Sequence, residues 1–104
     1  MTMLVALILL AGGDGPISKF STRSPDAVVT SARAMGDVER CLIDADGRLP
    51  PNVYRQPDRP DEVTLLWLGP NGLAQARADI HREQTGSKVT SWGVGKAART
   101  CAGA

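Results

Sequence analysis

The feature that most constrains this chain is an uncharged apolar run at its start, residues 4–11. A helix that spans a bilayer needs about 20 apolar residues, and this run is about half as long. Its length, and the small residues Ala11, Gly12 and Gly13 at its end, are typical of a secretory signal peptide. We therefore expect residues 1–13 to be a signal peptide-like segment that directs export. The alternative is a buried strand of the domain.

The end of this segment, LLAGG at residues 9–13, is similar to the lipidation signal of bacterial lipoproteins, Leu-Ala-Gly-Cys. Gly13 stands where the lipidated cysteine would be. Without that thiol no thioether to a lipid can form, which argues against a lipid anchor. We predict a bacterial protein that is periplasmic or secreted. Contact with a membrane would then be made only through the uncleaved N-terminal segment.

The predicted compartment determines how the two cysteines, Cys41 and Cys101, are interpreted. In an exported chain an even number of cysteines predicts a disulfide, here Cys41–Cys101, whereas a cytosolic chain would keep free thiols. A metal site is not expected, because two cysteines and a single histidine without close spacing cannot form a tetrahedral set of ligands.

Composition limits the remaining possibilities. The formal net charge is +1 and only four residues are aromatic, which predicts no nucleic-acid partner. About 90 residues remain after the apolar start, enough for one small domain with a modest core. We expect a flexible tether at residues 14–24, with Phe20 either docked on the domain or idle. A single domain would then cover residues 25–104.

The chemistry of its first residues predicts that this domain begins with a helix. Ser24 is a suitable N-cap, Pro25 fits the first helical position, and Asp26 would complement the positive end of the helix dipole. An apolar stripe at helical spacing follows, made of Val28, Ala32 and Met35. The Gly36-Asp37 pair either interrupts this helix or begins a second short one, with Asp37 as its cap.

The second half of the chain has the pattern of a sheet. Val53 and Tyr54 fit a short edge strand, and residues 62–68 a strand placed centrally. Strands are also expected at residues 73–83 and 88–92, with a short closing helix at 95–101. The predicted fold class is α+β, with two layers. One main helix would pack on an antiparallel sheet of three to four strands, followed by a short C-terminal helix.

Residues 73–83 alternate in polarity, which favours a strand, whereas the alanines by propensity alone would favour a helix. Ala74, Ala76, Ala78 and Ile80 should face the helix, and their small size would let it approach closely. The opposite face would carry the polar side chains Gln75, Arg77, Asp79, His81 and Glu83. Antiparallel sheets often leave one face open, so this row is either a solvated surface or a possible binding face.

Two short motifs are better explained as turns. Residues 44–47, DADG, match the centre of a calcium loop, but Leu42 and Val53 occupy positions where acidic ligands are needed. Residues 93–96, GVGK, match the end of a phosphate loop, but Thr90 replaces its first glycine and Ala97 the magnesium-binding hydroxyl residue. We therefore predict no catalytic, cofactor-binding or metal-binding residues from these motifs.

His81 is the only histidine. General acid–base catalysis would need a carboxylate that orients its ring and a nucleophile nearby. Asp79 shares its predicted strand face, and Ser87 and Ser91 lie on the next strand. A small hydrolase that uses His81 is therefore one hypothesis, and an exposed histidine on a sheet is the simpler interpretation.

The segments STRSPDAVVTSARAMG, TGSKVTSW and AARTCAGA together resemble those of small uncharacterised proteobacterial envelope proteins. The resemblance covers residues 4–101 in outline, implies an α+β fold and an envelope location, and implies no activity. The expected function is a non-enzymatic binding or structural role, with a possible envelope protein as partner. The alternative is an inhibitor of an envelope or foreign hydrolase.

Overall fold

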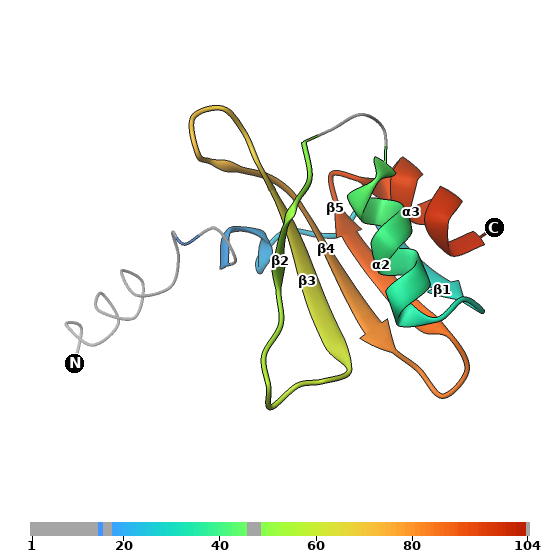
Figure 1. Ribbon diagram of the computed structural model, residues 1–104. Helices are drawn as coiled ribbons and strands as arrows, with labels where there is room; N and C mark the ends of the chain where they lie inside the picture. Colours follow the sequence, from blue (N-terminus) through green and yellow to red (C-terminus); the bar gives the residue numbers. More distant parts are fainter. Residues whose placement is uncertain (1–14, 16–17, 46–48, 104) are drawn as a thin grey trace, which may run out of the picture.

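A computed structural model describes residue 15, residues 18–45 and residues 49–103; the predicted signal peptide-like segment lies outside these ranges. A five-stranded antiparallel sheet, in the order β1-β5-β4-β3-β2, carries two helices on one face (Figure 1). The elements in chain order are the 3-10 turn η1 (Ser18–Phe20), β1 (Ala27–Ser31), α2 (Met35–Ile43), β2 (Asn52–Tyr54), β3 (Glu62–Leu68), β4 (Ala74–Arg82), β5 (Ser87–Trp92) and α3 (Gly95–Gly103).

The α+β class is confirmed, but the finer prediction of the architecture is only partly matched. The sheet has five strands instead of three to four, and the two helices have nine residues each. The predicted edge strand is β2. The strand predicted to be central, β3, has a neighbour on each side, although β4 is the middle strand. No helix in the described part of the chain is long and apolar enough to cross a membrane.

The fifth strand, β1, lies where the sequence predicted the first helix, so that prediction is wrong. Val28, Val29 and Thr30 are β-branched, and such side chains lose rotamer freedom in a helix and pack well on a pleated sheet. Their burial alternates with period two, since Ala27 and Ser31 are buried while Val28 and Thr30 are exposed. β1 pairs with β5, which places Val29 opposite Val89.

The first α-helix is α2, which begins at Met35. Gly36 and Asp37 therefore lie in its first turn, as in the alternative of a second short helix. Asp37 is not the cap, however: the N-cap is Ala34, which has no side-chain capping bond. An acidic residue in the first turn still stabilises the helix by interacting with its dipole.

The core lies between the sheet and the two helices. α2 contributes Met35, Val38 and Leu42, which share one cluster with the buried alanines of β4 and with Ile80. The prediction that Ala76, Ala78 and Ile80 face the helical layer is thus confirmed. Because alanine side chains are small, α2 can lie close to the middle of the sheet.

Ala74 departs from the predicted alternation. The pairing of β3 with β4 shifts register between Trp67 and Leu68, so that Leu68 faces Ala74 while Trp67 faces Ala76. Such an irregularity changes the face to which the following side chains point. Ala74 therefore belongs to a second cluster, with Phe20 and Leu66 and with Trp92 packed against it, and is separated from the main core.

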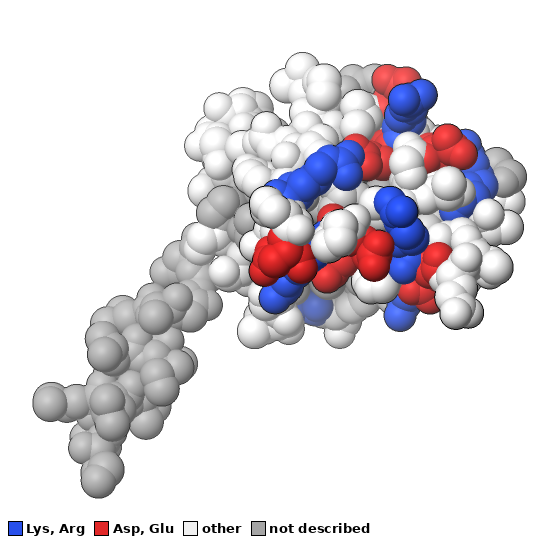
Figure 2. Space-filling view, turned by 60° about the horizontal axis from the view of Figure 1, so that its bottom comes forward, with Lys and Arg blue, Asp and Glu red and all other residues white. Residues whose placement is uncertain are grey.

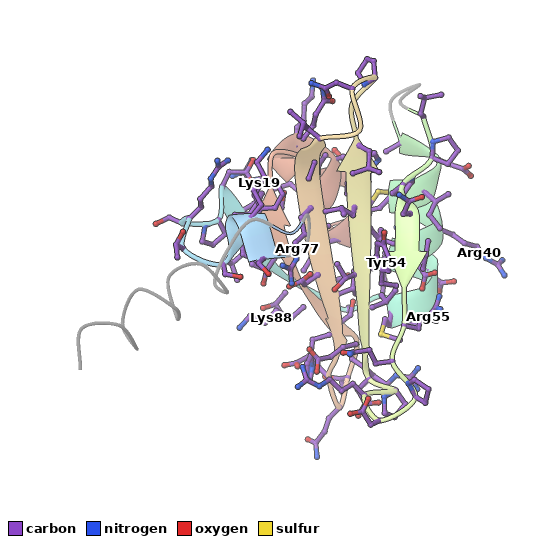
Figure 3. All side chains as sticks on the ribbon, turned by 90° about the vertical axis from the view of Figure 1, so that its left-hand side faces the viewer. Lys19, Arg40, Tyr54, Arg55, Arg77 and Lys88 are labelled. Carbon is purple, nitrogen blue, oxygen red and sulfur yellow. A yellow bond between two sulfur atoms is a disulfide. The ribbon has the colours of Figure 1, made fainter. Side chains whose placement is uncertain are left out.

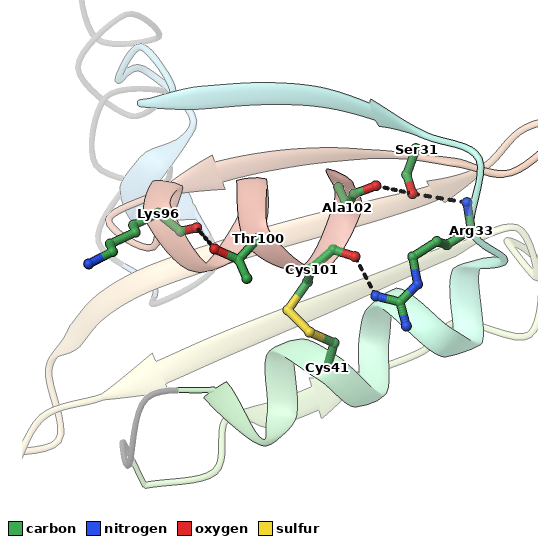
Figure 4. The surroundings of a disulfide bond; sticks show 7 residues. All are labelled: Ser31, Arg33, Cys41, Lys96, Thr100, Cys101 and Ala102. Atoms are coloured by element: carbon green, nitrogen blue, oxygen red, sulfur yellow. Dashed lines mark hydrogen bonds between the residues drawn. A yellow bond between two sulfur atoms is a disulfide. The ribbon is translucent and has the colours of Figure 1, made fainter. Parts of the chain in front are cut away.

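The ends of α3 are both bonded to β1 and its flanking residues. At its start the Gly95 N–H donates to Asp26 Oδ2 at 3.1 Å. At its end Ser31 Oγ donates to the Ala102 carbonyl and Arg33 Nη1 to the Cys101 carbonyl, each at 2.6 Å (Figure 4). An acid at the N-terminus and a base at the C-terminus both complement the helix dipole. Asp26 therefore does complement a helix dipole, but that of α3.

The predicted disulfide between Cys41 and Cys101 is confirmed. It joins the last turns of α2 and α3, with 5.6 Å between the two Cα atoms (Figure 4). Cys101 is buried in the main core, and Cys41 packs against that core. The bond therefore connects the two helices of one layer across a sequence separation of 60 residues.

We expect Cys41→Ser/Cys101→Ser to lower the free energy of unfolding by about 4 kcal/mol, because a loop of this length constrains the unfolded chain. Urea denaturation of the oxidised protein and of the double variant measures the difference. Reductant should destabilise the natural protein and leave the variant unaffected. Equal midpoints for the two oxidised proteins would contradict the prediction.

Gly86, in the turn between β4 and β5, offers a second test. Its φ is +94°, and a Cβ built there would lie 1.9 Å from the Ser31 carbonyl oxygen. Gly86→Ala should therefore destabilise the protein by more than about 1 kcal/mol. Gly36→Ala is the control, since a Cβ on Gly36 meets nothing within 4 Å. Alanine there should stabilise α2 by up to about 1 kcal/mol. Thermal melts compare the two variants.

Candidate functional site

The sheet face opposite the helices is the candidate site. Figure 3 looks toward this face, on which Arg77 and Lys88 are labelled. Strand register places the polar side chains of three neighbouring strands here, with Thr64 opposite Asp79 and His81 opposite Lys88. These side chains make up what we call the open face: Glu62, Thr64, Arg77, Asp79, His81, Lys88 and Thr90.

A fixed ion pair lies at the middle of the open face. Arg77 donates to both carboxylate oxygens of Asp79, at 2.8 Å from Nε and 2.9 Å from Nη2. Thr64 Oγ1 donates to the same carboxylate at 3.0 Å. The Arg77 side chain is only 15% exposed, and its guanidinium lies 5.3 Å from the centre of the Trp92 ring. A bidentate pair that also stacks on an aromatic ring holds its geometry more firmly than a surface lysine would.

Two shallow hollows flank this ion pair. One, of about 320 Å³, is lined by residues that include Tyr54, Arg59 and Arg77. The other, of about 350 Å³, is lined by residues that include His81, Lys88 and Thr90. Glu62 and Asp79 line both, so the two hollows meet at the centre of the open face.

Acidic and basic side chains alternate across this region. Where the lower end of the molecule is turned forward in Figure 2, blue and red side chains interleave. Glu62 and Lys88 are both exposed. The hollows that these two residues line flank the Arg77–Asp79 pair. A surface of mixed sign suits a partner with complementary charges of both signs, such as another protein.

The structure separates the residues of the proposed hydrolase. His81 is exposed, and its Nδ1 lies 3.1 Å from Glu83 Oε2, whereas Asp79 is bonded to Arg77 and Thr64. The two serines named with it are buried and bond toward the helical side: Ser87 Oγ donates to the Arg33 carbonyl, and Ser91 Oγ accepts from the Val94 N–H. This arrangement gives no support to a catalytic group formed by His81 and either serine.

Gln75 is also set apart from the rest of the predicted row. It follows Ala74 at the register shift of β4 and lines a hollow of about 190 Å³ together with Phe20 and Trp92. Of the four residues predicted as a binding face, the structure keeps Arg77, Asp79 and His81 on the open face. Gln75 lies beside the aromatic cluster at its end.

That cluster belongs to the predicted tether, of which residue 15 and residues 18–24 are described. Phe20 is docked: it is 3% exposed and packs on Leu66 and Ala74, with its ring centre 6.4 Å from that of Trp92. The Trp92 Nε1–H donates to the Arg23 carbonyl at 3.0 Å, and Lys19 Nζ donates to the Ala74 carbonyl at 2.6 Å. The segment therefore covers one end of the sheet face that the helices leave open.

Cations flank both rings of this cluster. Lys19 lies 5.8 Å and Arg23 5.4 Å from the centre of the Phe20 ring, and Arg77 approaches Trp92. Such contacts are each worth about 0.5–1 kcal/mol on a surface. The segment is thus linked to the ion pair of the open face through Trp92. In the sequence, this segment shows only a single phenylalanine between two basic residues. That pattern does not indicate which part of the domain the ring packs against.

A second exposed surface lies at the turn between β3 and β4. Leu68 and Leu73 flank this turn and are 37% and 60% exposed. The Gly69 N–H donates to the Leu73 carbonyl at 2.8 Å, and the Gly72 N–H donates back to the Gly69 carbonyl at 2.9 Å. These bonds close the turn, which lies at the upper end of the sheet in Figure 1.

The GVGK motif already uses two of its backbone N–H groups for bonds within the protein. At the GVGK motif, the Val94 and Gly95 N–H groups that an anion would need are already bonded to Ser91 and Asp26. The DADG motif lies partly outside the described residues. Among those that are described, no cluster of three or more His, Cys, Asp or Glu side chains could hold a metal ion.

Comparisons of the chain with models of protein families, with curated proteins and with solved structures gave no match.

The docked segment can be tested with Phe20→Ala. Losing a buried phenyl ring costs at most about 3–5 kcal/mol, and less where the segment can detach. We expect the emission of Trp92 to shift to longer wavelength and trypsin to cleave faster after Lys19 and Arg23. Phe20→Leu, which keeps most of the apolar volume, should show smaller changes. Unchanged cleavage in Phe20→Ala would contradict the docking.

Proposed function

We propose that this protein is a small exported envelope protein with a non-enzymatic role, and that it binds another protein through its open face. The observation that carries the proposal is the asymmetry of the sheet. One face is covered by α2 and α3. The other keeps polar side chains in fixed positions, and among the described residues no helix or strand covers the Arg77–Asp79 pair.

Export is supported by the disulfide, because such bonds persist in oxidising compartments. The bond lies between two short helices whose layer would otherwise be held by a small core. A chain of this size gains more from a covalent link than a large domain does.

A protein partner is supported by the chemistry of the open face. Arginine and tyrosine are enriched where binding energy concentrates at interfaces, and Arg77 and Tyr54 line the same hollow. Arg77 is already held by Asp79 and Trp92, so little of its conformational entropy remains to be lost on binding. The exposed Glu62 and Lys88 would form the polar surroundings.

An inhibitor of a hydrolase is the second candidate, and the β3–β4 turn is the observation that favours it. This turn is closed by its own backbone hydrogen bonds and presents Leu68 and Leu73 to solvent. A loop held in one conformation binds a concave site with less entropic cost than a mobile loop.

Export can be tested by the intact mass of the natural protein purified without reductant. We expect a chain that lacks the first residues, to about residue 13, and that lacks the mass of two hydrogen atoms because of the disulfide. The same measurement would reveal a lipid. A full-length chain with Met1 and two free thiols, recovered from the cytosol, would contradict the proposal.

Binding can be tested by cross-linking in intact cells, with two charge swaps that leave the net charge unchanged. Glu62→Lys/Lys88→Glu reverses charges on the open face and should abolish a stoichiometric cross-linked complex. Asp58→Lys/Lys96→Glu makes the same exchange at exposed positions outside the open face and should preserve it. A complex that survives the first swap would contradict binding through the open face.

The inhibitor candidate predicts a different result for the same complex. Leu68→Ser/Leu73→Ser would abolish it, and the purified partner would be a hydrolase that loses activity when the natural protein is added. A partner without hydrolase activity would exclude this candidate and leave the open-face proposal standing.

A further inference from the structure

The two edges of the sheet differ in how well they are protected from pairing with another strand. β2 has three residues and lies between prolines, Pro50 and Pro51 before it and Pro57 after it. Short edge strands and prolines are the devices by which proteins prevent edge-to-edge association. β1 has five uncharged residues and exposes 55% of Val28, and a proline, Pro25, lies close to its start only. The β1 edge is therefore longer than the β2 edge and has a proline on one side instead of both.

The backbone groups on the outer side of β1 can be assigned from Gly86. A Cβ on that residue would touch the Ser31 carbonyl oxygen, so this oxygen faces β5. In antiparallel strands, successive residues direct their N–H and C=O groups alternately to one side and the other. Val28 and Thr30 consequently direct theirs away from β5. In the described part of the chain, no strand lies beyond β1 to form hydrogen bonds with these outward N–H and C=O groups.

We propose that a second copy of this protein pairs with β1 in antiparallel orientation, about a two-fold axis at Val29. In this register Val28 of each copy lies opposite Thr30 of the other, so the outward N–H and C=O groups of these residues bond to each other. Both side chains are on the open-face side, where the exposed Val28 would pack on the threonine methyl group. The sheet then continues from one copy into the next.

Charge favours this partner and this orientation. Asp26 precedes β1 and Arg33 follows it, so the strand carries an acid at one end and a base at the other. Antiparallel pairing brings each Asp26 toward Arg33 of the second copy, whereas parallel pairing would bring like charges together. The β1 strands of two copies, with the charged residues at their ends, are therefore complementary in charge when they pair in antiparallel orientation. Because few side chains become buried, we expect a reversible dimer at high micromolar concentration.

The test uses the oxidised protein, purified after export to the periplasm of an expression host, in sedimentation equilibrium. Natural protein should show a monomer–dimer equilibrium. Val28→Lys/Thr30→Lys places lysines opposite lysines and should remain monomeric, as should Val28→Glu/Thr30→Glu. A mixture of these two variants should restore the dimer, because each lysine then faces a glutamate. Both positions are exposed, so the fold and its thermal midpoint should be retained.

The matched control is Asn52→Lys/Tyr54→Lys, which introduces the same charges at exposed positions of the protected edge strand β2. It should dimerise as the natural protein does. The proposal is overturned if the natural protein stays monomeric at every concentration up to about 1 mM. It is also overturned if the lysine variant of β1 dimerises equally well, or if the mixture of charged variants shows no association. None of these results depends on the open face having a partner.

Discussion

The arrangement of the helical layer depends on the contacts between β1 and α3. Asp26 binds the start of α3 and Arg33 its end, and both flank one strand that pairs with β5. A helix of nine residues has little stability of its own in water, because nucleation is costly. Bonds at both termini satisfy backbone groups that a short helix leaves unpaired. With α3 fixed in this way, the disulfide from Cys101 holds α2 on the same face.

The sequence predicted the sheet better than the elements around it. Strict alternation in β4 and the apolar run of β3 are local patterns, and they identified both strands and the buried alanines. β1 was missed because Ser24, Pro25 and Asp26 have the chemistry of a helix start, while the competing signal was only the run Val28–Val29–Thr30. That run becomes a strand through its pairing with β5, some 60 residues away in the sequence, which no local pattern can show. The position of Ala74 likewise depends on a register shift that its own alternation conceals.

The candidate site was also predicted only in part, because a local pattern shows on which face a side chain lies but not what it bonds to. Period two in β4 placed Arg77, Asp79 and His81 on one face, because side-chain direction in a strand follows from position alone. Which of these groups bond to one another depends on the register with β3, which brings Thr64 to Asp79, and on Trp92 beside Arg77. Phe20 completes the site from a segment with no regular pattern, so its role could be found only in three dimensions.

The docking of Phe20 limits the part of the polar sheet face that another molecule can reach. Since the ring is held against Leu66 and Ala74, this end of the face is occupied by the chain itself. A molecule that approaches the polar face therefore meets the docked segment at one end and the two hollows at the centre. The accessible area is narrower than the sheet, and it is bounded on one side by an aromatic ring.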